Sequence, residues 1–220
     1  MIGRTVAAAG ARVKSLYAMF IGMPSRRYEL KERARRQGET RQRIVDATVA
    51  LHREVGPART TIAEVARRAG VGRVTVYNHF PDDSSLLAAC SADFVASHPP
   101  PDPRAWAAIA DPDARLRAAL TEAYAYFREN AAMLGNVARD AALIPALADV
   151  LARSGAREHA EAMRDALLAG RGLRGGARRR VRAAIGLALD LATWQRLTAE
   201  GGLSDAEAVD VMAAGVRAAA

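Results

Sequence analysis

The chain has 220 residues, of which half are hydrophobic, only 5% are aromatic and 51 are Ala. This length allows one large or two small domains with a buried core, and the abundance of Ala favours helices over sheets. Cys90 is the single cysteine, which excludes an internal disulfide and a multi-thiolate metal site and predicts a reduced, cytoplasmic protein. No apolar run reaches the roughly eighteen residues of a membrane span, so a transmembrane protein is excluded.

The net charge of +8 is unevenly distributed along the chain. Residues 1–80 contain 16 Lys and Arg against 6 Asp and Glu, whereas residues 81–220 contain 16 against 18. This split is expected when only the N-terminal third of a protein meets a polyanion such as DNA. Nearly all the basic residues are Arg, which favours bidentate contacts with phosphate or guanine, although a GC-rich genome gives the same bias.

The N-terminal residues 1–25 carry three positive charges and no acid. We interpret them as a disordered extension or as sequence upstream of a true start at Met23; a targeting peptide and a surface-binding helix are the alternatives. Residues 1–38 as a whole are assigned to a basic, partly disordered arm, of which residues 1–22 are expected to be dispensable.

Two helices are predicted next. Apolar side chains spaced by three and four residues predict a helix over 37–54, which Gly56 and Pro57 end. A second helix is expected to start at Thr61, because its hydroxyl and the Glu64 carboxylate have the spacing of a capping box.

Gly70 and Gly72 provide the flexible backbone of a tight turn before a third, short helix over 73–80. A basic arm followed by three such helices is typical of a helix-turn-helix domain, which we place at 39–83. In the third helix, apolar side chains fall on one side. The other side carries groups that can contact bases or phosphates, namely Val74, Thr75, Asn78 and His79, with Tyr77 at its edge.

From Thr60 to Phe80 the sequence TTIAEVARRAGVGRVTVYNHF resembles the DNA-binding signature of TetR-family transcriptional regulators. A threonine pair, a glycine turn and a Thr-x-Tyr-x-His-Phe ending coincide at fixed spacing, and the resemblance covers about residues 39–90. It implies an all-α protein with an N-terminal three-helix helix-turn-helix domain followed by a helical ligand-binding and dimerisation domain. The DNA-binding candidates are Arg35, Arg36, Arg41, Arg43, Thr60, Thr61, Arg73, Val74, Thr75, Tyr77, Asn78 and His79.

Three positions depart from the family pattern. Gly72 stands where a Ser commonly opens the recognition helix, and Val74 stands where Gly or Pro is frequent. Asp83 replaces a frequent Lys, and a carboxylate cannot attract a phosphate. The arginines of the arm are candidates to offset this loss, with a merely solvated basic face as the alternative.

The remainder, 84–220, is predicted to be a helical effector-binding and dimerisation domain. Four prolines within 99–103 are the best linker signal in the chain. The last helix begins with a second capping box, formed by Ser204 and Glu207. Helices are expected over 84–97, 104–109, 113–130, 144–153, 156–169, 176–199 and 204–218.

Two sets of apolar side chains in this domain are candidates for function. An apolar stripe on helix 113–130 is more typical of a core than of a pocket, but Trp106, Tyr124, Phe127, Met133 and Val137 are candidates for an effector cavity. Helix 176–199 is apolar around too much of its circumference to pack on one core only, so we expect a homodimer through the two C-terminal helices. The interface candidates are Leu187, Leu191, Trp194, Val209, Met212 and Val216.

The sequence thus predicts a transcriptional regulator, a repressor that binds a palindromic operator in double-stranded DNA as a homodimer and is released by a small-molecule effector of unknown identity. An architectural DNA-binding dimer without an effector is the alternative. No nucleophile motif, phosphate-binding loop or metal-ligand cluster is evident, so we expect no enzyme activity, no cofactor, no metal and no membrane partner. Cys90 is expected in the core, with redox sensing as the alternative, and His52, His98 and His159 in the core or at the surface.

Overall fold

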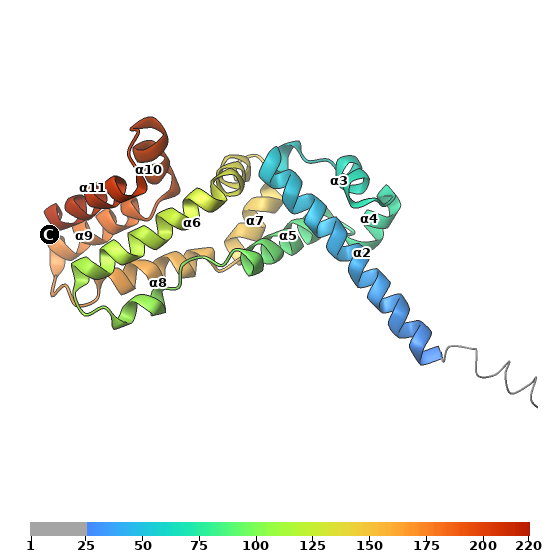
Figure 1. The fold of residues 1–220 in the computed structure, drawn as a ribbon, viewed down its shortest axis with the longest axis horizontal. Coiled ribbons are helices and arrows are strands. Elements are labelled where there is room, and N and C mark those ends of the chain that lie inside the picture. Colours follow the sequence, from blue (N-terminus) through green and yellow to red (C-terminus); the bar gives the residue numbers. More distant parts are fainter. Residues whose placement is uncertain (1–25) are drawn as a thin grey trace, which may run out of the picture. The chain divides into compact units, whose positions relative to one another are not determined.

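Figure 1 shows a computed structural model of the chain, in which residues 26–220 are described. Every regular element between Arg26 and Ala220 is a helix and none is a strand, which confirms the all-α prediction. No helix in this range is long and apolar enough to cross a membrane. The expectations for residues 1–25, including a start at Met23, lie outside the described residues.

The helices follow one another through short turns. They are α2 (Arg26–Glu54), the 3-10 helix η1 (Pro57–Arg59), α3 (Ile62–Ala69), α4 (Arg73–His79), α5 (Asp83–Ser97), the 3-10 helix η2 (Pro103–Ala108), α6 (Pro112–Ala141), α7 (Pro145–Arg153), α8 (Ala156–Leu168), α9 (Gly175–Ala188), α10 (Leu191–Gln195), the π-helix η3 (Arg196–Glu200) and α11 (Asp205–Ala218).

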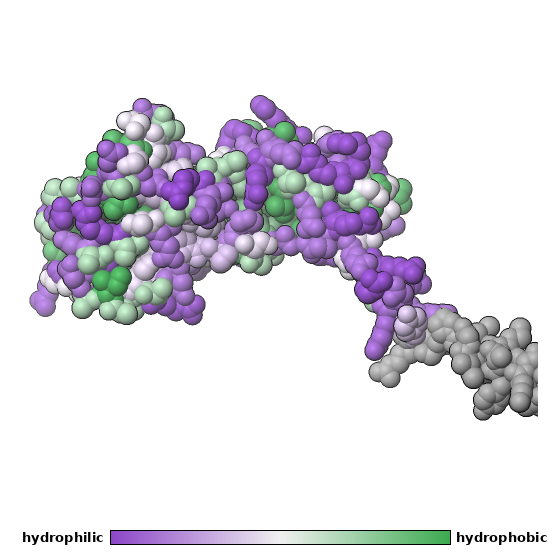
Figure 2. Space-filling model, in the orientation of Figure 1, coloured by the Kyte–Doolittle hydropathy of each residue, from purple (hydrophilic) through white to green (hydrophobic). Residues whose placement is uncertain are grey.

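The chain divides into two compact units after Arg43, and each is described by itself. In the first unit, α2 starts at Arg26, well before residue 37, where the apolar pattern predicts the start of a helix. Charged pairs one turn apart stabilise this stretch in place of an apolar face. Figure 2 accordingly shows it as mostly hydrophilic. The pairs are Glu32 with Arg35 at 2.5 Å, Glu32 with Arg36 at 3.2 Å, and Arg35 with Glu39.

In the second unit, the C-terminal part of α2 packs with α3, α4 and the start of α5. Thr61 caps α3 by accepting a hydrogen bond from the Glu64 amide at 3.2 Å, as predicted. The Glu64 carboxylate does not complete the capping box in this way but pairs with Arg67 at 2.5 Å. Gly70 ends α3 with a φ of 67°, a left-handed conformation that favours glycine. The buried residues are Ile44, Val45, Ala47, Leu51, Val65, Ala66, Ala69, Val76, Phe80, Leu86 and Cys90.

A second, larger core lies where α6, α8, α9 and α11 pack side by side (Figure 1). Leu116, Leu120 and Tyr124 of α6 are fully buried there, and the Tyr124 hydroxyl donates to the Ala188 carbonyl at 3.0 Å. The prolines of 99–103 do not separate independent bodies. Helix α5, which precedes them, packs against α7, and Leu87 contributes to a small core with residues of that helix.

Helix α6 is longer than predicted. The sequence ends it at Asn130, a residue that favours helix ends, yet α6 continues to Ala141. The Asn130 side chain is turned back into its own helix and donates to the Tyr126 carbonyl at 2.9 Å, so it does not form a cap that would end the helix.

The predicted single helix over 176–199 is wrong, because the structure breaks it between α9 and α10. Asp190 has an extended backbone and its carboxylate accepts from the Thr193 amide at 3.0 Å, which starts a new helix. The side chains after Asp190 therefore do not continue the faces of α9.

Candidate DNA-binding surface and ligand cavity

One side of helix α4 is exposed to solvent, and the opposite side is buried. Val76 is fully buried and Phe80 nearly so, whereas Val74 is 74% exposed and Tyr77 is 52% exposed. Asn78 is also exposed, and Thr75, Arg73 and His79 lie on the accessible sides of the helix. The expected arrangement of the recognition helix is present, and its contacts with DNA stay a prediction.

The two threonines before α3 form hydrogen bonds with nearby backbone groups. Thr60 donates its hydroxyl hydrogen to the Gly56 carbonyl at 2.9 Å, and Thr61 caps α3. Gly72 caps α4 without a side-chain hydrogen bond, as expected from the missing Ser. Each threonine oxygen keeps a lone pair for a further donor, but neither supplies a positive charge.

Two arginines of α3 are held by carboxylates. Arg67 pairs with Glu64, and Arg68 makes a two-pronged contact with Glu54 at 2.6 and 2.8 Å. These contacts lower the pKa of both Glu54 and Glu64. Because both pairs are exposed and screened by solvent, phosphates can replace the carboxylates at little cost.

The four arginines of the arm lie on exposed positions of α2. Arg35 and Arg36 share Glu32, and Arg43 donates to the Thr40 hydroxyl at 3.3 Å. The pairing of Arg35 and Arg36 with acids of the same helix is the feature that charge counting missed. The role of Arg41 and its neighbours in binding phosphate stays a prediction.

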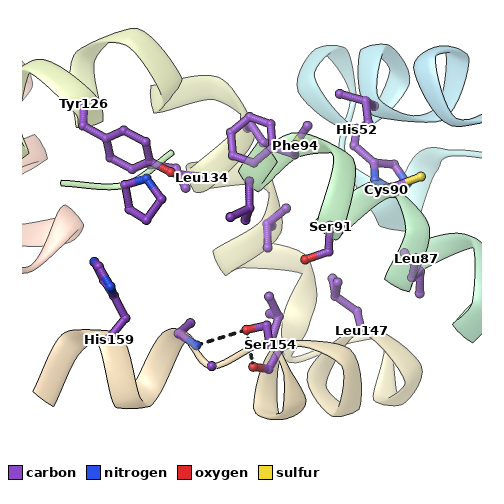
Figure 3. A pocket seen from close by; sticks show the side chains of 18 residues that line it. His52, Leu87, Cys90, Ser91, Phe94, Tyr126, Leu134, Leu147, Ser154 and His159 are labelled. Atoms are coloured by element: carbon purple, nitrogen blue, oxygen red, sulfur yellow. Dashed lines mark hydrogen bonds between the residues drawn. The ribbon is translucent and has the colours of Figure 1, made fainter. Parts of the chain in front are cut away.

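A cavity of about 410 Å³, partly open to solvent, is lined by α5, α6, α7, α8 and the C-terminal part of α2 (Figure 3). Most of its lining is apolar, including Phe94, Leu134 and Leu147. Of the five effector candidates, Met133 and Val137 line this cavity. Trp106 and Tyr124 instead lie in the large core, and Phe127 packs against it. The apolar side of α6 that includes Leu116 and Leu120 thus faces the core, whereas Met133 and Val137, further along the helix, face the cavity.

Polar groups are few in this cavity and come from separate helices. Figure 3 shows His52 of α2, Ser91 of α5, Tyr126 of α6 and His159 of α8 around it. Burial lowers the pKa of His52 to about 4 and raises the pKa of the Tyr126 hydroxyl. The Nε2 atom of His159 is buried and has no hydrogen-bond partner among the described residues. Sequence reasoning assigned both histidines to core or surface positions and did not place them at a pocket.

The last turns of α6 hold the segment that connects α2 to α3. Asn136 donates to the carbonyls of His52 and Arg53 at 3.0 Å each. The buried Asp140 carboxylate accepts from the Ala58 amide at 2.9 Å and from Arg139 at 2.7 Å. These contacts lower the pKa of Asp140, so it stays charged.

Gly56 lies within this connection at a φ of 92°. A Cβ at this position would lie 2.3 Å from an Arg139 nitrogen and 2.5 Å from an Asp140 oxygen. The sequence indicates only that Gly56 ends a helix. In the structure, a residue without a Cβ is also required at this position, because Arg139 and Asp140 of α6 lie close to its backbone.

The six interface candidates do not form one exposed face. Leu187 is 60% exposed on α9, whereas Leu191 and Met212 are partly buried against the large core of their own chain. Trp194, Val209 and Val216 are buried in that core, and the Trp194 indole donates to Asp205 at 2.9 Å. The expectation that Trp194 faces a partner rested on an unbroken helix, so the break at Asp190 explains the error.

Comparison with known proteins connects the first of these sites to a family. A sequence profile described as bacterial regulatory proteins, tetR family, matches residues 44–90. An uncharacterized HTH-type transcriptional regulator of Mycobacterium bovis is 39% identical over 61 residues, which are 28% of this chain and 32% of that protein. Residues 44–90 therefore match the sequence pattern of the tetR family. The HTH-type transcriptional regulator BetI of Serratia proteamaculans is 43% identical to this chain over 58 residues, or 26% of this chain and 29% of BetI.

These two matches span about a third of the length of the relatives. Beyond this segment, the likeness to known proteins concerns the fold. A solved protein of Mesorhizobium loti, assigned to the TetR family of transcriptional regulators, aligns with a TM-score of 0.62 and 19% identity, over 84% of this chain and 96% of that one. The chain therefore shares the fold of that protein.

Proposed function

We propose that the protein is a transcriptional repressor that binds a palindromic operator as a homodimer and leaves it when a small molecule occupies the cavity. The observation that carries the proposal is the outward face of α4, within the segment that matches the tetR family. In a helix-turn-helix domain this face enters the major groove. The small molecule, the dimer and a cytoplasmic location are part of the proposal.

Sequence readout is assigned to α4. The exposed Asn78 amide can bond an adenine edge through both of its polar atoms, and the Val74 methyl groups can contact a thymine methyl. Tyr77 can donate to a phosphate oxygen. Thr75, His79 and Arg73 are assigned to further base or phosphate contacts along the same helix.

Coupling to the cavity is assigned to the end of α6. Met133 and Val137 line the cavity, while Asn136, only one residue from Val137, bonds the end of α2. A ligand that displaces this turn of α6 also displaces the hydrogen bonds to the DNA-binding domain. The factor by which the ligand lowers operator affinity equals the ratio of its own affinities for the displaced form and for the DNA-bound form of the protein.

A two-fold dimer is assigned to the surface around Leu187. This side chain is exposed beside Gly186 on α9, with Arg164, Arg179 and Arg182 around it. Arg164 lies against Gly186, so the exposed Leu187 side chain, and not a close approach of two helices, supports this contact. A two-fold axis also supplies the paired recognition helices that a palindrome requires.

The proposal is tested by sequencing the genomic fragments that the purified protein retains. We expect enrichment of a short palindrome, and loss of that enrichment in an Asn78→Ala variant that remains folded. Fragments without a common sequence would contradict operator binding. If an operator is found and no small molecule changes its affinity, the protein is instead the architectural dimer.

A further inference from the structure

The cavity between α5, α6, α7 and α8 has an unusual absence of charge for a chain with 25% charged residues. Among the described residues that line it, none is Lys, Arg, Asp or Glu. A charged ligand would give up its hydration there without gaining a counter-charge. The lining therefore favours a neutral occupant.

One polar atom in the cavity needs a partner. Nε2 of His159 is buried, and no atom of the described residues forms a hydrogen bond with it. Figure 3 shows the His159 ring pointing from α8 towards the side of the cavity where Tyr126 points from α6. The Ser154 hydroxyl, in contrast, already donates to the Leu151 carbonyl at 2.8 Å.

We propose that the cavity binds a neutral, mainly apolar molecule whose single hydroxyl or carbonyl group forms a hydrogen bond with Nε2 of His159. This inference rests on the proposed function, in which the cavity is the effector site. The apolar part of the molecule lies against Phe94, Leu134 and Leu147. At the ~30 Å³ that one water molecule occupies in the liquid, 410 Å³ holds roughly 14 non-hydrogen atoms.

His52 is consistent with the same chemistry. It lines the cavity at the end opposite His159 in Figure 3 and is only 6% exposed. Because burial keeps its imidazole uncharged near neutral pH, it does not provide an anion site. The two histidines therefore do not act as a cationic pair for a carboxylate.

The test compares three probes that share one alkyl chain, measured by calorimetry on the full-length protein at neutral pH. They are 1-octanol, which is neutral, octanoate, which is anionic, and octylammonium, which is cationic. We expect octanol to bind at least tenfold more tightly than either ion. Tighter binding of octanoate or octylammonium, or no binding of any probe, would overturn the proposal.

Variants locate the site and its hydrogen bond. His159→Phe is expected to weaken octanol binding about fivefold, as for one lost neutral hydrogen bond, and His159→Gln is expected to restore most of it. Leu134→Trp and, independently, Leu151→Phe fill the cavity and are expected to prevent binding. Arg157→Gln, at an exposed position of α8, is the matched control and is expected to bind normally. Equal octanol affinity in His159→Phe and the control would remove His159 from the site.

Operator affinity measured with the same probes separates this inference from the proposed function. If octanol binds in the cavity and operator affinity is unchanged, the ligand class stands and the coupling through α6 fails. If only a charged molecule releases the operator, the coupling stands and the inferred ligand class is wrong.

Discussion

At the scale of single residues, His52 has the clearest consequence for stability. Burial lowers its pKa to about 4, against an ordinary value of 6.5. Between these two values the unfolded chain binds a proton that the folded protein does not, so stability is full above pH 6.5 and falls as the pH decreases towards 4. We expect a loss of about 3 kcal/mol over this range.

This loss is measured by urea unfolding at pH 7, 5 and 4. His52→Gln removes the titrating group while keeping a polar side chain of similar reach, so its free energy of unfolding is expected to depend less on pH by about the same amount. The same pH dependence in the variant and the parent would show that other groups cause the acid sensitivity.

Asn78 is the residue on which sequence readout is expected to depend most. Replacement by Ala removes a bidentate contact with a base and is expected to cost about 1–3 kcal/mol on the preferred operator. Affinity for unrelated DNA should be nearly unchanged, because phosphate contacts dominate there. Fluorescence anisotropy with both DNAs checks this expectation, and an unchanged preference would exclude Asn78 from readout.

Among the contacts between helices, the one at Gly56 can be tested directly, because the backbone of Gly56 lies against Arg139 and Asp140 of α6. Gly56→Ala is expected to destabilise the protein, because it combines a strained positive φ with a clash against Arg139 and Asp140. Gly202→Ala is the matched control, since Gly202 has a φ of 69° and open space around it. Thermal unfolding should show a cost for Gly56→Ala that exceeds the control by about 1–2 kcal/mol. Equal costs would indicate that α6 moves aside without penalty.

The basic arm is a second element with a measurable effect. If Arg35 and Arg36 neutralise phosphates, removal of residues 1–38 should weaken binding to all sequences and reduce the salt dependence by roughly 0.9 log unit for each lost contact. Removal of residues 1–22 is expected to do little. Titrations at several salt concentrations compare both truncations, and a large effect of the shorter one would contradict the assignment of residues 1–22 as dispensable.

The elements also show what sequence reasoning can and cannot predict. Helices α3 and α11 begin where hydroxyl caps predict, because Thr61 and Ser204 are local signals. The end of α6 and the break after α9 were not predicted, because Asn130 and Asp190 are compatible with either a helix interior or a helix end. The hydrogen-bond partners of their side chains decide whether the helix continues or ends. A pattern of apolar residues does not show these partners.

At the scale of the whole molecule, the cavity is the feature that the sequence predicts least. Its walls come from five helices, and Tyr124 and Tyr126, two residues apart on α6, face the core and the cavity respectively. Periodicity shows that α6 has apolar sides but not which neighbour covers each of them. The outward face of α4 was predicted because Val76 and Phe80 fall on one side of this short helix, and they are the buried side chains.

Dimerisation is tested at Leu187. Leu187→Glu leaves the isolated chain nearly unaffected because the side chain is exposed among arginines, but it places two desolvated charges in the proposed interface. Sedimentation should then show a monomer with weak operator binding. Leu143→Glu, at an exposed leucine after α6, is the control and should remain dimeric. Leu191→Glu is unsuitable, because Leu191 packs on the core of its own chain. A dimeric Leu187→Glu variant would place the interface elsewhere.

The position of Cys90 has a practical consequence. It is the single thiol of the chain and lies in the lining of the cavity. A small fluorinated thiol reagent that enters the cavity would label this one site without any engineered cysteine, although slowly, because the thiol is only 4% exposed. The fluorine resonance would report from inside the cavity, and a second signal in the ligand-free protein would reveal a pre-existing minor conformation and its population.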